Sequence, residues 1–208
     1  MRIFAPFLLA PLLLAGCAEK ALSLPNDLKP LEEVTVACAG EDEVVVETED
    51  REDYAAAQAC GLLSVDIATA YAAITTPGVT VDAREVTTWE KEPLDCDFDD
   101  CYRIHNIVED LVTVEFYMDW GHGATGGTAD EVTQTNSRWL KSEGSDFIDL
   151  EEGSAQLTVE EEGLTRIEFV HRLKSYSPGE DTERVRNFVQ DLFDRMAAEA
   201  KGEPYPTY

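Results

Sequence analysis

The hydrophobic positions along this chain recur with two different periods, and the change between them marks the predicted elements. In the middle of the chain, Val112, Val114, Phe116, Met118 and Trp120 alternate with polar residues. A period of two is typical of an antiparallel strand that buries one face. Comparable alternation predicts further strands over residues 79–89, 102–109, 131–140, 154–160 and 164–174.

Helical spacing is found on either side of this β-rich region. Apolar residues at positions 63, 67, 71 and 74 predict a helix that ends before Pro77. A long amphipathic helix is predicted near the C-terminus, and it stops at Gly202. Its apolar stripe consists of Val185, Phe188, Val189, Leu192, Phe193 and Met196. Two short strands over 34–36 and 44–46 precede these elements, so the chain predicts one α+β domain.

The order of these elements resembles the helix-grip fold of START-like and polyketide-cyclase-like (SRPBCC) proteins. The best local match is the stretch 153–159, the strand 165–173 and the final helix, and we place the domain at residues 34–202. The resemblance implies a curved antiparallel sheet packed on a long C-terminal helix. It also implies an apolar cavity between them, which in such proteins commonly holds lipids or other hydrophobic ligands.

The N-terminus resembles that of a bacterial lipoprotein. An apolar run over 3–14 is too short to span a bilayer as a mature helix, and it ends in the motif Leu14-Ala15-Gly16-Cys17. The resemblance implies that residues 1–16 are a signal peptide and that Cys17 carries a thioether-linked diacylglycerol.

The same resemblance predicts the membrane to which the protein is sorted, and the composition of the next residues predicts how the domain is attached. Ala18 stands where retention in the inner membrane would usually need Asp, so we expect an outer-membrane lipid anchor with the protein facing the periplasm. Residues 17–33 lack a period and contain two prolines, which predicts a lipidated tether, and residues 203–208 form a tail.

Composition narrows the range of functions. The 208 residues suit one domain, and 44% hydrophobic residues are too many for a disordered acidic tail. The chain has 16 Lys and Arg against 43 Asp and Glu, giving a formal charge of −27. This charge repels phosphate backbones and anionic headgroups, and it excludes sequence-independent binding of nucleic acid.

Four cysteines remain once Cys17 is assigned to the lipid: Cys38, Cys60, Cys96 and Cys101. An even number in an exported protein implies two disulfides with three alternative connectivities. We favour Cys96 with Cys101, which closes a short loop, and Cys38 with Cys60, which would tie a strand to the following helix. A zinc site is the alternative, but the Cys-x4-Cys spacing is not the usual one.

Large apolar side chains on the predicted inner faces are candidate ligand-binding residues. They either fill a solid core or wall a cavity, and the sequence leaves both open. His171 joins them because it is in phase with the inward residues of its strand, as a hydrogen-bonded core histidine, a polar fixture of the cavity or an acid/base. The candidates are Phe116, Met118, Trp120, Trp139, Phe169, His171 and Phe188.

Two other motifs carry less weight. Residues 121–126 match G-x-G-x-x-G, but the β-favouring residues that follow do not open a helix, so we expect a mobile hairpin loop over 121–127, near the cavity mouth. The aspartates at 95, 97, 99 and 100 would suit Ca²⁺, yet they fail the EF-hand pattern and favour a solvated acidic turn. We therefore predict neither a cofactor nor a metal.

The leading hypothesis is a lipid-anchored protein that binds a hydrophobic or amphiphilic ligand without transforming it. The alternative is an envelope scaffold or accessory lipoprotein whose core is solid and whose acidic surface docks a protein partner. An enzyme that pairs His171 with a carboxylate such as Glu115 is the third hypothesis. The presence or absence of a cavity separates the first two.

Overall fold

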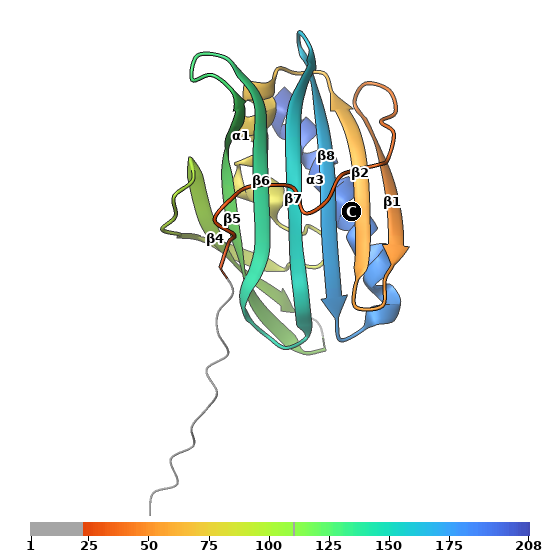
Figure 1. Cartoon of the computed structure of the whole chain (residues 1–208). Helices are drawn as coiled ribbons and strands as arrows, with labels where there is room; N and C mark the ends of the chain where they lie inside the picture. The colour runs from red at the N-terminus through yellow and green to blue at the C-terminus, as the bar shows by residue number, and fades with distance from the viewer. Residues whose placement is uncertain (1–22, 110) are drawn as a thin grey trace, which may run out of the picture.

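The computed structural model describes residues 23–109 and 111–208 (Figure 1). The predicted signal peptide over 1–16 and the predicted lipidation site Cys17 lie outside these residues. The described elements are β1 (Glu43–Asp50), β2 (Ala55–Leu63), α1 (Ile67–Ile74), α2 (Pro77–Thr80), β3 (Thr88–Pro93), β4 (Asp100–Glu109), β5 (Thr113–Gly127), β6 (Val132–Gly144), β7 (Ile148–Glu161), β8 (Leu164–Ser175) and α3 (Pro178–Lys201).

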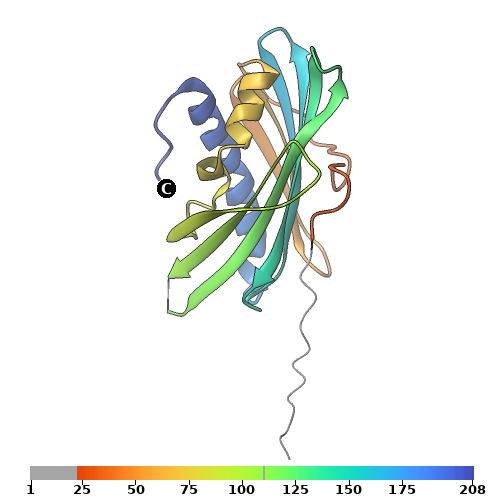
Figure 2. The same ribbon diagram turned by 90° about the vertical axis from the view of Figure 1, so that its left-hand side faces the viewer.

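Within the described residues, eight strands form one antiparallel sheet in the order β1-β2-β8-β7-β6-β5-β4-β3. Because α1 and α2 cross from β2 to the far edge, the meander from β3 to β8 returns to pair with β2. Figure 2 shows the sheet from the side, curved around the helices, which all lie on its concave face. The expected curved sheet around the last helix is confirmed.

The inner layer is formed by the two patterns that the sequence displays most clearly. Phe116, Met118 and Trp120 of β5 are buried, as their alternation predicts. All six residues of the apolar stripe of α3 are also buried, and the helix packs on β1, β2 and β8. Each large side chain buried in this way contributes about 1.5–3 kcal/mol, so these two elements carry much of the stability of the core.

The segment before β1 lies on the outer, convex face of the sheet, where it crosses β6, β7, β8 and β2 (Figure 1). Leu28 is buried there, and the Arg138 guanidinium donates a hydrogen bond of 2.9 Å to the Lys29 carbonyl oxygen. Further along, Glu32 forms an ion pair of 3.0 Å with Arg172. Residues 28–33, expected to belong to a tether, are therefore attached to the sheet.

The two disulfides join Cys38 to Cys60 and Cys96 to Cys101, which is the favoured connectivity. Their structural roles differ in part from the expectation. Cys60 lies in β2 and Cys38 in the outer segment, so the first bond ties this segment to the sheet and not a strand to a helix.

Two predicted strands near the start of the domain are wrong, and the predicted helix begins later than expected. No strand forms over 34–36, since these residues belong to the outer segment. Leu63 ends β2 and the helix begins only at Ile67, because the alanine-rich run before it pairs with β8. The predicted strand over 79–89 is mostly α2 and a turn in which Asp82 accepts hydrogen bonds from the backbone N–H groups of Arg84 and Glu85.

The loop predicted over 121–127 is also wrong, because β5 continues to Gly127. Its glycines suit the strand, since Phe98 and Leu24 press on the outer side of Gly121 and a Cβ there would lie 2.8 Å from the Phe98 ring. On the inner side, His122 is fully buried and its Nδ1 lies 2.8 Å from the Ser137 hydroxyl. Residues 121–127 therefore do not form a flap over the cavity.

Across the part of the chain that the structure describes, no helix is both long enough and apolar enough to span a bilayer.

Candidate ligand-binding site

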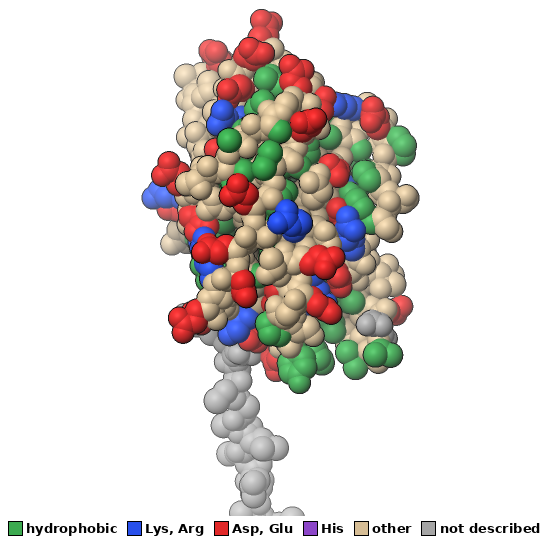
Figure 3. Space-filling model, turned by 90° about the vertical axis from the view of Figure 1, so that its right-hand side faces the viewer, with side chains coloured by type: hydrophobic (Ala, Val, Ile, Leu, Met, Phe, Trp, Pro, Cys, Tyr) green, Lys and Arg blue, Asp and Glu red, His purple; other side chains and the backbone are tan. Residues whose placement is uncertain are grey.

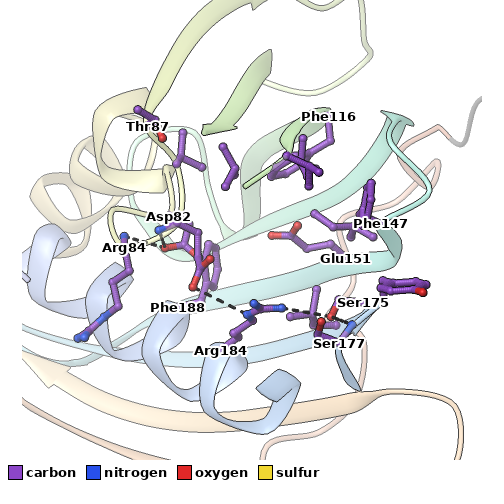
Figure 4. Close-up of a pocket in the computed structure, with 18 of the residues that line it drawn as sticks. Asp82, Arg84, Thr87, Phe116, Phe147, Glu151, Ser175, Ser177, Arg184 and Phe188 are labelled. Atoms are coloured by element: carbon purple, nitrogen blue, oxygen red, sulfur yellow. Dashed lines mark hydrogen bonds and ion pairs between the residues drawn. The ribbon is translucent and has the colours of Figure 1, made fainter. Parts of the chain in front are cut away.

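A cavity of about 440 Å³ lies between the inner face of the sheet and α3 (Figure 4). Its wall comes from β4, β5, β7, β8, α3 and the turn after α2. Seven apolar side chains form most of its interior: Val86, Val108, Val114, Phe116, Ile148, Leu173 and Phe188. Polar and charged side chains, among them Asp82, Glu151 and Arg184, complete the lining, and a volume of this size is typical of small-molecule sites.

The mouth of the cavity has an apolar rim. Val112, Phe147 and Tyr176 line the cavity and are exposed, and Leu111 beside them is 96% exposed. They come from the β4–β5 turn, the β6–β7 turn and the junction of β8 with α3. Figure 3 shows a group of hydrophobic side chains at the lower end of one face, on which acidic side chains are scattered and outnumber basic ones.

The structure divides the sequence-predicted ligand residues into three groups. Phe116, His171 and Phe188 line the cavity itself. Met118 and Trp120 lie deeper, where they line an adjoining space of about 10 Å³. This space is barely large enough for one water molecule, so these two residues serve the core more than a ligand.

Trp139 and Phe169 are fully buried and line neither space. The Trp139 indole stacks on Trp120 with ring centroids 4.6 Å apart, and it covers the Cα of Gly153. Trp139 supports the floor of the cavity from behind without facing the ligand space.

His171 is a buried neutral histidine at the inner wall. Its Nδ1 accepts a hydrogen bond of 3.2 Å from the Trp139 indole Nε1, which leaves the proton on Nε2. Its ring stacks on Phe188 with centroids 4.2 Å apart. Burial lowers the pKa of His171 to about 3, and His122 has a pKa of about 3 for the same reason. His171 is thus poorly suited to act as a base near neutral pH.

The pairing of His171 with Glu115 is not formed. Glu115 accepts from His105, whose Nε2 lies 3.3 Å away, and this pair is on the other face of the sheet. The carboxyl group that lines the cavity together with His171 is that of Glu151 in β7, and the sequence did not point to it.

Glu151 is the main polar group inside the cavity. It is 9% exposed, and Figure 4 shows its carboxyl group directed into the ligand space between Phe116 and Phe188. Burial raises its pKa to about 8, the charge of Asp82 adds to the rise, and the charge of Lys141 opposes it. The group therefore holds its proton at about pH 7. Glu151 alternates in step with the inward residues Gly153, Ala155 and Leu157, which could have predicted that it faces the cavity. The predicted strand began only at 154, so this alternation was not extended back to Glu151.

Asp82 faces the same space from the turn after α2, and burial raises the pKa of its carboxyl as well. Two arginines stand at the cavity wall, and both are held by acidic partners. Arg84 forms a two-pronged ion pair with Asp191, at 2.6 and 2.9 Å. Arg184 contacts Glu180 at 3.0 Å and the Ser175 hydroxyl at 3.3 Å.

The acidic turn at residues 95–100 does not form a metal site. Over residues 23–109 and 111–208, no three or more His, Cys, Asp or Glu side chains are arranged to hold a metal ion. Asp99 instead accepts a hydrogen bond of 2.8 Å from the backbone N–H of Ala124 and fixes the turn to β5.

The curved antiparallel sheet, the long C-terminal helix and the cavity between them define the described part of the chain as a helix-grip fold. No family model matches the sequence, and no curated protein matches it.

Solved structures of START-like and cyclase proteins share the fold. A STAR-related lipid transfer protein from Xanthomonas axonopodis has a TM-score of 0.54 and 8% identity, over 76% of this chain and 93% of that one. The Zhui aromatase/cyclase from Streptomyces has a TM-score of 0.51 and 10% identity, over 70% and 93%. The human StarD13 lipid transfer and protein localization domain has a TM-score of 0.50 and 10% identity, over 79% and 90%. At these identities the likeness concerns the fold alone.

Proposed function

We propose that this protein binds a hydrophobic or amphiphilic molecule in the helix-grip cavity without transforming it. The observation that carries the proposal is the cavity of about 440 Å³, in which apolar side chains surround the Glu151 carboxyl group and exposed apolar residues form part of the mouth. Two structural neighbours are named as a lipid transfer protein and a lipid transfer domain, which supports the same class of ligand. An open cavity also argues against the solid core of the scaffold alternative.

Filling the cavity is expected to abolish ligand binding. Val114 lines the cavity from β5, and Val114→Trp would place an indole inside it. Fluorescence of the neutral apolar probe N-phenyl-naphthylamine is expected to rise with the wild-type protein and to stay near its value in buffer with the variant. Val159→Trp, at a 40% exposed position outside the cavity, is the matched control and is expected to bind like wild type. Absence of any response from the folded wild type would contradict the proposal.

We also propose that a lipid on Cys17 anchors the protein to the outer membrane, with the domain facing the periplasm. In the full chain, Cys17→Ala is expected to move the protein from the membrane fraction to the soluble periplasmic fraction, because the acyl chains provide the anchoring energy of about 0.8 kcal/mol per buried methylene. Ala18→Asp keeps the cysteine, and by resemblance to lipoprotein sorting it is expected to shift the protein to the inner membrane. Fractionation with palmitate labelling tests both, and a soluble wild type would refute the anchor.

A further inference from the structure

We propose that the cavity selects a cationic amphiphile, whose protonated amine lies between the carboxyl groups of Glu151 and Asp82. The inference rests on the proposed function and specifies the chemical class of its ligand. Both carboxyl groups line the main cavity, and both also line the small space behind it.

The first observation is that Glu151 has no partner. It is more than nine-tenths buried and directed into the cavity (Figure 4), and within residues 23–109 and 111–208 its carboxyl group makes neither a hydrogen bond nor an ion pair. A carboxyl group with so little exposure and no partner is costly to ionise, because burial removes most of its hydration. A ligand that supplies a positive charge and N–H donors would remove this cost.

The second observation is that Asp82 has spare capacity on the opposite wall. Its Oδ1 accepts hydrogen bonds of 2.9 and 3.2 Å from the backbone N–H groups of Arg84 and Glu85. No hydrogen bond to its Oδ2 is formed by the described residues. Figure 4 shows Asp82 and Glu151 on opposite sides of the ligand space, with Phe188 below. An amine between them would have two acceptors.

The third observation is that the positive groups around the cavity are already paired. Arg84 is held by Asp191 and Arg184 by Glu180, while the Lys141 ammonium donates a hydrogen bond of 2.6 Å to the Ile148 carbonyl oxygen. His171 on β8 is neutral. An anionic ligand would therefore meet the carboxyl groups of Glu151 and Asp82, while both arginines that line the cavity already have acidic partners.

These observations rank three headgroups. An ammonium pairs with both carboxyl groups once Glu151 gives up its proton, an alcohol leaves at least one of them unpaired, and an anion must lie beside Asp82 with the protonated Glu151 as its donor. The formal charge of −27 adds a long-range attraction for cations. Binding of the amine should thus release protons, which a neutral alcohol does not cause.

The test compares three probes with the same ten-carbon chain: decylammonium, decanol and decanoate. Each is titrated into the wild-type protein at about pH 7, with displacement of N-phenyl-naphthylamine as the readout. Decylammonium is expected to bind about tenfold or more tightly than decanol, as one charge-assisted contact is worth about 1.5–3 kcal/mol, and decanoate is expected to bind least. Calorimetry in two buffers of different ionisation enthalpy is expected to show proton release for decylammonium alone.

Variants locate the preference. Glu151→Gln is expected to weaken decylammonium about tenfold and to leave decanol within about threefold, and Asp82→Asn is a second, independent variant with the same expected direction. Glu90→Gln removes an exposed carboxylate far from the cavity and is expected to change neither probe.

Failure of this inference and failure of the proposed function give different results. Decanol binding as tightly as decylammonium, or a preference for the amine that persists in both cavity variants, overturns the cationic ligand and leaves the proposed function standing. Binding of none of the three probes overturns both.

Discussion

Glu151→Gln is expected to stabilise the protein at about pH 9 and to change its stability little at about pH 5. The pKa of Glu151 is raised from 4.5 to about 8, so the folded state keeps a proton that the unfolded state has already lost over this window. Its contribution to the free energy of unfolding therefore falls as pH rises from about 4.5 to about 8 and is constant above. Gln does not titrate, so the variant does not lose stability in this way as pH rises. At high pH its free energy of unfolding is expected to exceed that of wild type by on the order of 3–5 kcal/mol.

The measurement is urea unfolding of both proteins between about pH 5 and about pH 9. The two buried histidines, with pKa values of about 3, make stability rise with pH up to about 6.5, but they act equally in both proteins and cancel in the difference. Wild type is expected to be most stable near pH 6.5, and the variant to remain level above it. Glu90→Gln is the exposed control and should run parallel to wild type. A difference between Glu151→Gln and wild type that does not depend on pH would show that Glu151 is ionised in the folded state.

The sequence predicts correctly those elements that bury a single face and expose the other. The alternation in β5 and the stripe of α3 each indicate which side meets the other layer, so the sequence predicts Phe116 and Phe188 on inner faces, and both line the cavity in the structure. Periodicity is sufficient there because each residue's environment is set by its own element.

The errors arise where tertiary packing overrides local preference. The alanine-rich β2 favours a helix by propensity, yet α3 lies so close to this strand that a Cβ on Gly61 would come 2.8 Å from Cδ2 of Phe193. Small residues in β2 are thus required by the helix above it. The glycines at 121 and 123 fit the same explanation on the outer face, where Leu24 and Leu28 press on β5.

The candidate site was only half predictable for a related reason. Its apolar wall follows from strand phase, but Glu151 and Asp82 are polar residues in a very acidic chain, and nothing in the sequence separates them from the solvated acids. Their role depends on where β7 begins and on how the turn after α2 folds back over the sheet.

Gly153→Ala is expected to destabilise the protein by about 3 kcal/mol or more, at the upper end for overpacking. Gly153 of β7 faces Trp139 of β6, and a Cβ at this position would overlap the indole atoms Cζ2 and Cε2. The indole cannot move away easily, because Trp120 stacks on its ring and its Nε1 donates to His171. Gly179→Ala is the matched control: no atom lies within 4 Å of the added methyl group in the first turn of α3, so its effect should be near zero or stabilising.

A second substitution tests whether the clash with Trp139 is the cause. Trp139→Phe removes the part of the indole that a Cβ on Gly153 would overlap, although alone it costs stability by leaving a cavity. Because the two changes compensate in volume, the double variant is expected to be more stable than the sum of the single effects predicts, by about 1–2 kcal/mol in a double-mutant cycle. Purely additive effects in urea unfolding would place the cost of Gly153→Ala in the strand backbone and not in the Trp139 contact. Trp139 also holds the His171 ring against Phe188, so Gly153→Ala should weaken binding of N-phenyl-naphthylamine. Adding Trp139→Phe to Gly153→Ala should not restore this binding fully, because Phe cannot donate a hydrogen bond to His171.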